Sequence, residues 1–447
     1  MRPLTTISYW EVFKNRKRIL ANPLPFHREN FEKYGDTFKV KIGLGNRVVF
    51  TRDPQIIQQV LQKQHKKFHK SPLQTRDLAK YIGHGLLTAE GEHWRTHRRM
   101  IQPAFHKKKL EGLLGIMQEA IVDELKGINP NKDQDVFPLM GDLAFQVVAK
   151  SLFGRSDIRQ RMKTLQHITE ANQKMLIKEM RQPYLKWWFT VSGQLRKHLK
   201  LSAQSRDLLN ELIDEREASI DDNSDLLDML LNATYEDGTH MPRRQLIDEV
   251  LILFTAGHET TANVLSFSLY LLARHPIIQE QVFDEVSKAA IHSTEPMNWL
   301  SKLQYTQQCI EEAMRLYPSV YVIDRISIKE ASLGGYNFPK DTLLLMSMYE
   351  LHRHKSFWKD PETFKPERFE TKGKKEMGAY YYPFGAGPRM CVGNNFAMYE
   401  MIMAIALIVR QYRVKSPLKE LELDPLISLK PKTVPVQFLP REPFSSL

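Results

Sequence analysis

Apolar residues recur every three or four positions over most of the chain between residues 90 and 290, and this period predicts a succession of α-helices. The longest apolar stretch, from Leu246 to Ala273, is interrupted by polar residues at its centre. Three further helices are predicted: one over residues 278–286, one over residues 305–316 that ends before Pro318, and one that begins near Asn394. The chain is therefore expected to be mainly α-helical.

Alternation of apolar and polar residues predicts a smaller β portion. Residues 37–42 and 47–50 alternate on either side of a glycine-containing turn, which predicts a β-hairpin. Residues 319–349 contain further short β-like runs. Two other stretches, residues 71–88 and 178–196, lack strong periodicity, and the first is expected to be an irregular loop.

The sequence shows no internal repeat, low-complexity linker or break in composition along its 447 residues. A chain of this length with 42% hydrophobic residues can bury a large core. We therefore expect residues 1–447 to form a single domain, mainly α with a small β portion.

Cysteine content and the lack of long apolar runs indicate the cellular compartment in which the protein is expected. Two cysteines, Cys309 and Cys391, are too few for a disulfide scaffold and favour a reducing compartment. No apolar run approaches the roughly 18 residues that a membrane span needs, and the N-terminus lacks the apolar core of a signal peptide. We therefore expect a cytoplasmic protein without a transmembrane anchor.

The net charge of +12 is compatible with nucleic acid, anionic lipid or an acidic protein as a partner. The basic residues are dispersed and no nucleic-acid-binding motif occurs, so we do not expect nucleic acid to be the partner. An acidic protein partner is the preferred interpretation, and a solvated basic surface is the alternative.

The stretch from Phe384 to Gly393 carries the most specific chemistry. Cys391 lies in a glycine-rich loop just before a predicted helix, where unpaired N–H groups and the helix dipole stabilise a thiolate. Arg389 offers a fork of donors suited to a carboxylate, and Gly387 and Gly393 let the backbone approach a flat molecule. A haem with a cysteine ligand satisfies all three features. A small buried hydrophobe is the alternative for a lone cysteine.

The pattern F-x-x-G-x-R-x-C-x-G in this stretch resembles the haem-binding loop of the cytochrome P-450 monooxygenases, and each fixed position matches. The resemblance implies the cytochrome P-450 fold, with haem b between the long central helix and the cysteine loop. It implies that Cys391 is the iron ligand and that Phe384, Arg389 and Gly393 contact the haem.

Residues 256–261 place Gly, Glu and two Thr inside the long apolar helix, against helix propensity. A threonine hydroxyl can bond the carbonyl four residues back and open the helix for water. A kink with a polar patch is the alternative. A zinc motif starting at His258 fails because Ala262 stands where the second histidine is needed.

The same segment resembles the oxygen-activation segment of the cytochromes P-450. The resemblance implies that Thr260 holds the bound oxygen species and that Glu259 delivers protons. It also implies that Ala256 and Gly257 lie over the haem face.

Three further side chains suggest a structural ion-pair cluster. Glu312 and Arg315 lie three residues apart, on one face of a predicted helix. On a solvated surface such a pair would contribute at most about 0.5 kcal/mol. Together with the later P-E-R-F sequence that contains Arg368, however, the pair resembles the E-x-x-R and P-E-R-F elements of the same family. The resemblance implies a buried triad that fixes the cysteine loop.

Trp94 and Arg98 lie four residues apart, so that both could donate to one carboxylate. A Trp that packs under an Arg stem is the alternative. The W-x-x-x-R pattern resembles the propionate-binding pair of the family. Arg325 and Arg389 would complete the set of propionate ligands by the same resemblance.

The resemblance implies insertion of one oxygen atom of O2 into a C–H bond, with two electrons from a separate protein. The chain has no length left for a fused reductase. The expected partner is a ferredoxin or flavodoxin with its NAD(P)H-dependent reductase. Its docking face is expected to include Arg95, Arg99 and the run Lys107–Lys109.

Substrate contacts are expected from four places: residues 71–88, residues 178–196, the helix near Phe254 and Ala256, and residues 320–323. Trp187 and Trp188 stand beside charged residues and could hold a polar ring-shaped substrate; packing in the core is the alternative. Oxidative O-demethylation of a methoxylated sugar or aromatic is one option, and hydroxylation of a fatty acid or terpenoid is another. A peroxide-using haem enzyme and a haem sensor without turnover remain as different functions.

Overall fold

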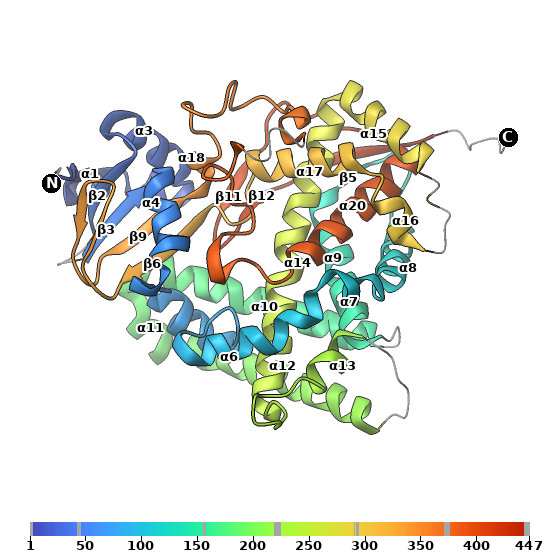
Figure 1. Cartoon of the computed structure of the whole chain (residues 1–447), viewed down its shortest axis with the longest axis horizontal. Coiled ribbons are helices and arrows are strands. Elements are labelled where there is room, and N and C mark those ends of the chain that lie inside the picture. The colour runs from blue at the N-terminus through green and yellow to red at the C-terminus, as the bar shows by residue number, and fades with distance from the viewer. Residues whose placement is uncertain are drawn as a thin grey trace.

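The computed structural model describes residues 3–42, 46–154, 158–218, 225–289, 291, 295–370 and 376–441. Figure 1 shows the main sheet at one end of the molecule, beside the N-terminal helices, and the long helix α14 through its middle. The helices are α1 (Tyr9–Lys14), α2 (Arg16–Ala21), α3 (Leu24–Tyr34), α4 (Pro54–Gln58), α5 (Ala79–Ile82), α6 (Gly91–Ile101), α7 (Lys107–Glu111), α8 (Leu114–Leu125), α9 (Val136–Phe153), α10 (Arg159–Arg181), α11 (Lys186–Val191), α12 (Gln194–Ala218), α13 (Leu226–Leu231), α14 (Arg243–Arg274), α15 (Pro276–Lys288), α16 (Pro296–Leu300), α17 (Gln304–Leu316), α18 (Met348–Leu351) and α20 (Asn394–Gln411). The mainly α-helical class is confirmed.

The main sheet has six strands in the order β1-β2-β3-β9-β6-β4. Their bounds are β1 (Thr6–Ile7), β2 (Thr37–Ile42), β3 (Asn46–Thr51), β9 (Leu343–Ser347), β6 (Val322–Ser327) and β4 (Phe68–His69). The predicted hairpin is present, since β2 and β3 pair antiparallel with Val40 opposite Val48. Residues 43–45 of its predicted turn lie outside the described residues. β3 and β9 pair in parallel, which joins the hairpin to the predicted β-like region after residue 319.

Three small sheets complete the β portion. They are β10 (Tyr412–Lys415) with β13 (Pro435–Pro440) and β5 (Asp133–Asp135), β11 (Leu423–Pro425) with β12 (Leu429–Pro431), and β7 (Ala331–Leu333) with β8 (Tyr336–Phe338). The β11–β12 hairpin bears on the site because β12 packs against α14.

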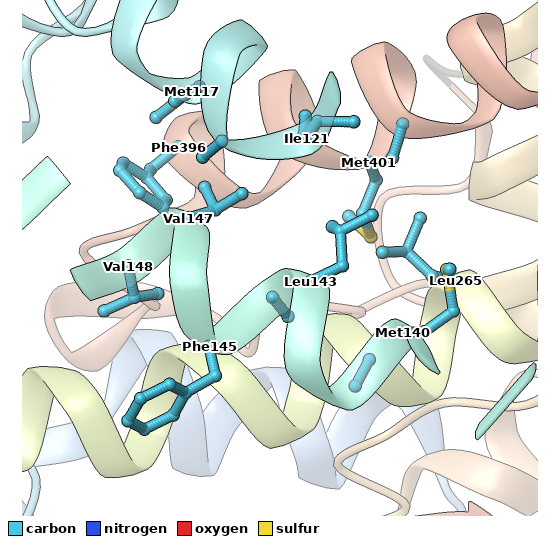
Figure 2. Packing of buried hydrophobic residues seen from close by; sticks show 14 of the residues in the cluster. Met117, Ile121, Met140, Leu143, Phe145, Val147, Val148, Leu265, Phe396 and Met401 are labelled. Carbon is cyan, nitrogen blue, oxygen red and sulfur yellow. The ribbon is translucent and has the colours of Figure 1, made fainter. Parts of the chain in front are cut away.

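The largest hydrophobic cluster lies where α8, α9, α14 and α20 meet. Figure 2 shows Leu143 and Met140 of α9 near Leu265 of α14 and Met401 of α20. Full burial of each such side chain contributes about 1.5–3 kcal/mol. Among the described helices, only α9 is long and apolar enough to cross a membrane, and 67% of that stretch is buried inside the protein. Its apolar character is therefore accounted for by the core.

The expectation of an irregular loop over residues 71–88 is confirmed for residues 83–88 and wrong for residues 72–82. The chain forms a π-helical turn, η3 (Leu73–Leu78), which continues into α5. No side chain of η3 is buried, so the turn has no apolar stripe for periodicity to detect. Instead, the side chains of Ser71 and Gln74 donate to the Asp324 carboxylate of β6.

Residues 178–196 contain the end of α10, a 3₁₀ turn (η5, Pro183–Leu185) and α11. Trp187 and Trp188 are 63% and 47% exposed, so packing in the core is excluded for both. Their rings contact each other edge to face, with centroids 5.8 Å apart.

Candidate functional site

The cysteine loop, residues 384–393, is held in one conformation by its own backbone and by a neighbouring segment. The Cys391 N–H donates to the Phe384 carbonyl at 2.9 Å, and a 3₁₀ turn, η7 (Gly387–Arg389), lies between them. Gly387 has a φ of +71°, and a Cβ there would lie 2.0 Å from the carbonyl oxygen of Leu61. Gly387 therefore serves contact with η1 (Gln59–Lys63) and not, as expected, contact with a flat molecule.

The other glycine of the loop is different. A Cβ on Gly393 would meet only the Phe105 ring, at 3.8 Å, so space remains on this side. Phe384 is partly buried against the main core and supplies the carbonyl that the Cys391 N–H bonds. Gly393 thus leaves space next to Cys391, and Phe384 fixes the Cys391 backbone.

Cys391 has an exposed side chain, whereas Cys309 in α17 is buried. Burial of the surrounding chain nevertheless raises the pKa of the Cys391 thiol, and the Gly393 N–H and Arg98 oppose this by favouring the thiolate. The Cys391 side chain is therefore accessible although much of the protein surrounds it. Arg98 also donates to the Met390 carbonyl at 2.8 Å, so α6 is tied directly to the cysteine loop.

The centre of α14 departs from the regular apolar helix. Ala256 is exposed although Phe254 and Thr255 beside it are buried, so it also faces open space. The Thr260 hydroxyl donates to the Ala256 carbonyl at 3.0 Å, as the sequence predicts for this threonine. A Cβ on Gly257 would lie 3.1 Å from Val148 of α9, so Gly257 faces that helix. The expectation that Gly257 lies on the haem face is therefore wrong.

His258 is a core residue. It is 5% exposed, its Nδ1 lies 2.8 Å from the Phe254 carbonyl, and its ring meets Phe145 edge-on. The Glu259 carboxylate next to it accepts a hydrogen bond from the Ser428 hydroxyl, which lies between β11 and β12. No sequence pattern points to Ser428, because it lies far along the chain from the α14 motif.

A cluster of buried charges lies beside the loop. Arg389 is ion-paired with Glu90, and its guanidinium lies 4.0 Å from the centre of the Trp94 ring. Trp94 thus packs against Arg389, whereas Arg98 bonds the loop carbonyl, so the two do not converge on one group here. Arg325 is buried, and its side chain donates to the Asp324 carbonyl at 2.7 Å.

Lys70 belongs to the same cluster, and the sequence analysis missed it. Its ammonium group donates to the carbonyls of Leu86 and Leu87 at 3.0 and 2.5 Å. Burial lowers the pKa of Lys70 to about 7, and repulsion from Arg389 and Arg325 adds to this. Burial also lowers the pKa of Arg389 to about 10, against the opposing effect of Glu90. No local pattern marks a lysine after a two-residue strand, so only the fold could reveal it.

The three side chains of the expected triad meet. Arg315 donates to both oxygens of Glu312, at 2.6 and 2.8 Å, and Arg368 donates to one of them at 3.3 Å. Glu312 and Arg315 are completely buried. Arg315 also donates to the carbonyls of His352 and Pro361, so the cluster fixes the segment after α18. It lies in the interior and not on a solvated helix face.

A family model described as Cytochrome P-450 matches residues 3–438. The chain belongs to the cytochrome P-450 family. It is 30% identical over 402 residues to cyclooctat-9-en-7-ol 5-monooxygenase of Streptomyces melanosporofaciens, covering 89% of this chain and 86% of that protein. It is also 30% identical over 402 residues to cytochrome CYP72A616 of Paris polyphylla, covering 85% of this chain and 75% of that protein. The solved cytochrome P450DA heme domain has the same fold, with a TM-score of 0.87, 23% identity and full coverage of both chains.

This cytochrome P-450 is therefore a monooxygenase, and the cofactor of the family is haem b bound through a cysteine thiolate. The residues present fit that cofactor on two observations. Cys391 is the cysteine with an exposed side chain, so its sulfur is open to a ligand. The cluster sets three basic side chains, Lys70, Arg325 and Arg389, against two carboxylates, Glu90 and Asp324, so it can accept the negative charge of a propionate.

A basic surface lies on α6, which is tied to the cysteine loop through Arg98, and on α7, which follows α6 along the chain. Arg95 and Arg99 are exposed and paired with Glu92 and Glu236. The run Lys107–Lys109 opens α7 and is exposed throughout. A monooxygenase of this family receives electrons from a redox partner, and these side chains offer a positive surface near the cysteine loop.

Proposed function

We propose that this cytochrome P-450 binds haem b with Cys391 as the iron ligand and inserts one oxygen atom of O2 into a C–H bond of a small organic ring compound. A thiolate-bound haem supplies O–O cleavage and the oxidation itself. The protein supplies position and protons. The observation that carries the proposal is the exposed Cys391 side chain on a loop held by the Gly387–Leu61 contact and by Arg98.

The residues around the haem have separate roles in this proposal. Arg325, Arg389 and Trp94 hold the propionate side, and Arg98 steadies the loop through the Met390 carbonyl. Thr260 keeps its hydroxyl hydrogen on Ala256, so its lone pairs are free to accept a hydrogen bond from the oxygen side. Glu259 brings protons to the same turn of α14.

The iron ligand is tested with a matched pair of variants. Cys391→Ser is expected to abolish the red-shifted absorption that marks a thiolate-bound, carbon-monoxide-bound ferrous haem. Cys309→Ser changes a cysteine that is buried in α17 and should leave this absorption in place. Retention of the absorption in Cys391→Ser would overturn the proposal.

The proposed substrate site includes the small cavity beside Thr255, which has room for little more than one water molecule. It is lined in equal parts by apolar residues, Leu78, Tyr81, Ile82, Leu176 and Leu251, and by polar residues, Thr169, Asn172, Gln173, Ser205 and Thr255. This lining does not favour an aromatic or terpenoid ring over a methoxylated sugar, so each is a candidate substrate. Oxidation of an O-methyl group would give a hemiacetal that separates into an alcohol and formaldehyde.

Hydroxylation of a terpenoid alcohol is the second candidate, because one relative is named for oxidising cyclooctat-9-en-7-ol. A screen of haem spectral shifts with terpenoid alcohols, fatty acids, methoxylated aromatics and methoxylated sugars separates these classes. Release of formaldehyde identifies O-demethylation. Product formation that depends on NAD(P)H and a surrogate reductase separates a monooxygenase that uses O2 from a peroxide-using enzyme or a haem sensor.

We further propose a ferredoxin or flavodoxin as the electron donor, docked on Lys107–Lys109, Arg95 and Arg99. A triple Lys107/108/109→Glu variant should accept electrons more slowly at low salt, and the difference should shrink as salt screens the charges. Lys355→Glu changes an exposed lysine outside this surface and serves as the control. Equal rates for the triple variant and wild type at low salt would contradict this docking site.

A further inference from the structure

The carboxylate of Glu259 has a single hydrogen-bond partner among the described residues. The Ser428 hydroxyl lies 2.7 Å from its Oε1. Ser428 is 6% exposed and follows Glu259 by 169 residues, in the turn between β11 and β12. This places a side chain from a separate hairpin on the residue proposed to deliver protons.

The direction of this hydrogen bond is fixed by chemistry. The Asn263 amide nitrogen can only donate, and it donates to the Ser428 oxygen at 3.1 Å. The single hydroxyl hydrogen of Ser428 is therefore directed to Glu259, which accepts it. Asn263 is completely buried one turn beyond Glu259 on α14, so its amide cannot swing away into solvent. The Ser428 hydroxyl is thus bonded to two side chains of α14, those of Asn263 and Glu259.

The turn that carries Ser428 is also fixed from outside. The Leu429 N–H donates to the Ser319 carbonyl at 2.8 Å, and the Ser319 hydroxyl donates to the Thr260 carbonyl at 2.9 Å. The Tyr321 hydroxyl donates to the Leu426 carbonyl at 2.9 Å. These bonds connect the turn between β11 and β12 to the segment of Ser319 and Tyr321 and, through Ser319, to Thr260. Figure 1 shows β11 and β12 beside α14, and β12 packs against that helix.

We propose that Ser428 is a positioning residue for proton delivery: it holds Oε1 of Glu259 so that Oε2 remains the free oxygen that carries protons. The proposal rests on the proposed role of Glu259. Its importance follows from the balance of the reaction, in which a C–H compound, O2, two electrons and two protons give an alcohol and water. A misdirected Glu259 slows the arrival of the two protons without weakening the binding of substrate.

The experiment compares four variants in the haem-bound protein. Ser428→Ala removes the donor, Ser428→Thr keeps it, and Glu259→Gln identifies the infrared band of the Glu259 carboxylate by difference. Ser266→Ala is the control, because this buried serine of α14 donates only to the Ala262 carbonyl, at 2.7 Å. The second measurement is the solvent isotope effect on NADPH oxidation with a surrogate ferredoxin and ferredoxin reductase.

Ser428→Ala is expected to shift the Glu259 band and to raise the solvent isotope effect about twofold, while Ser428→Thr and Ser266→Ala match wild type. Should Ser428→Ala fold poorly, Ser428→Cys keeps the volume with a weak donor and should fall between alanine and wild type. The inference is overturned if the Glu259 band does not shift, or the isotope effect does not change, in both Ser428→Ala and Ser428→Cys. If Glu259→Gln changes the isotope effect and Ser428→Ala does not, the inference alone falls. If neither changes it, the proposed role of Glu259 falls as well.

Discussion

The cysteine loop and the segment of residues 71–82 both belong to the candidate site, yet they are held by different kinds of contact. The cysteine loop rests on the backbone of Leu61 through Gly387. The completely buried pair of Glu312 and Arg315 holds His352, whose ring accepts from the Tyr382 N–H just before the loop. The 71–82 segment packs Tyr81 and Ile82 into the main core. Unlike the cysteine loop, it is also tied by a partly exposed ion pair, since Glu179 of α10 accepts from Lys80 and Tyr81 at 2.6 Å each.

The difference shows how a haem site and a substrate site can change independently. A buried charge that loses its partner costs several kcal/mol, whereas a partly exposed ion pair is worth about 1 kcal/mol or less. Lys80 is 26% exposed, so its pair with Glu179 lies between these limits. We therefore expect substitutions near the cysteine loop to unload the haem and substitutions at residues 71–82 to alter substrate binding.

The largest effect is expected from Glu312→Gln, which leaves Arg315 buried without its partner carboxylate. It should lower the free energy of unfolding by about 3–5 kcal/mol and release haem. Urea unfolding and haem content measure the two losses. Glu92→Gln removes the partner of Arg95 in another i, i+3 pair, but both side chains are exposed, so it should cost at most about 0.5 kcal/mol. Equal costs for the two variants would contradict the contrast drawn here.

Gly387→Ala tests the backbone contact of the loop. It combines a positive φ with a Cβ placed 2.0 Å from the Leu61 carbonyl oxygen. Gly335→Ala has a φ of +81° and no atom within 4 Å of the added Cβ, so it measures the backbone strain alone. We expect about 1–2 kcal/mol for Gly335→Ala and at least twice that for Gly387→Ala. Urea unfolding of the two variants gives the difference, and similar values would rule out the contact.

His352 is a buried residue beside Arg315, and its protonation should make the stability of the protein depend on pH. Burial, with repulsion from Arg315 and Arg353, lowers the pKa of His352 to about 3. The unfolded chain binds a proton near pH 6.5 and the folded protein does not, so stability falls as the pH drops from about 6.5 to 3, by on the order of 1 kcal/mol per pH unit. His352→Gln can still accept from the Tyr382 N–H and does not titrate, so its unfolding free energy should fall less steeply over this range. Parallel pH profiles for wild type and variant would show that another group titrates.

The sequence predicted those parts of the site whose residues lie close together in the chain. The pattern of the cysteine loop lies within the ten residues from Phe384 to Gly393, and Glu312 and Arg315 are one helical turn apart. The same reasoning could not find Lys70 or Ser428, because each reaches the site from a segment far away in the chain. It also misread Gly257 and Gly387, since a glycine shows that space is needed but not which neighbour fills it.

The smallest effect is expected on the polar side, from Glu179→Gln. The Tyr81 hydroxyl bonds Glu179, and Tyr81 lines the small cavity beside Thr255, so the carboxylate holds one wall of the proposed substrate site. Loss of its charge should weaken substrate binding about fivefold, roughly 1 kcal/mol, and leave haem content unchanged. Glu170→Gln on the same helix removes only a contact with Gln166 at 3.4 Å and serves as the control. Titration of the haem spectral shift measures binding. Loss of haem in Glu179→Gln would mean that α10 also supports the cofactor, and the separation of the two sides would not hold.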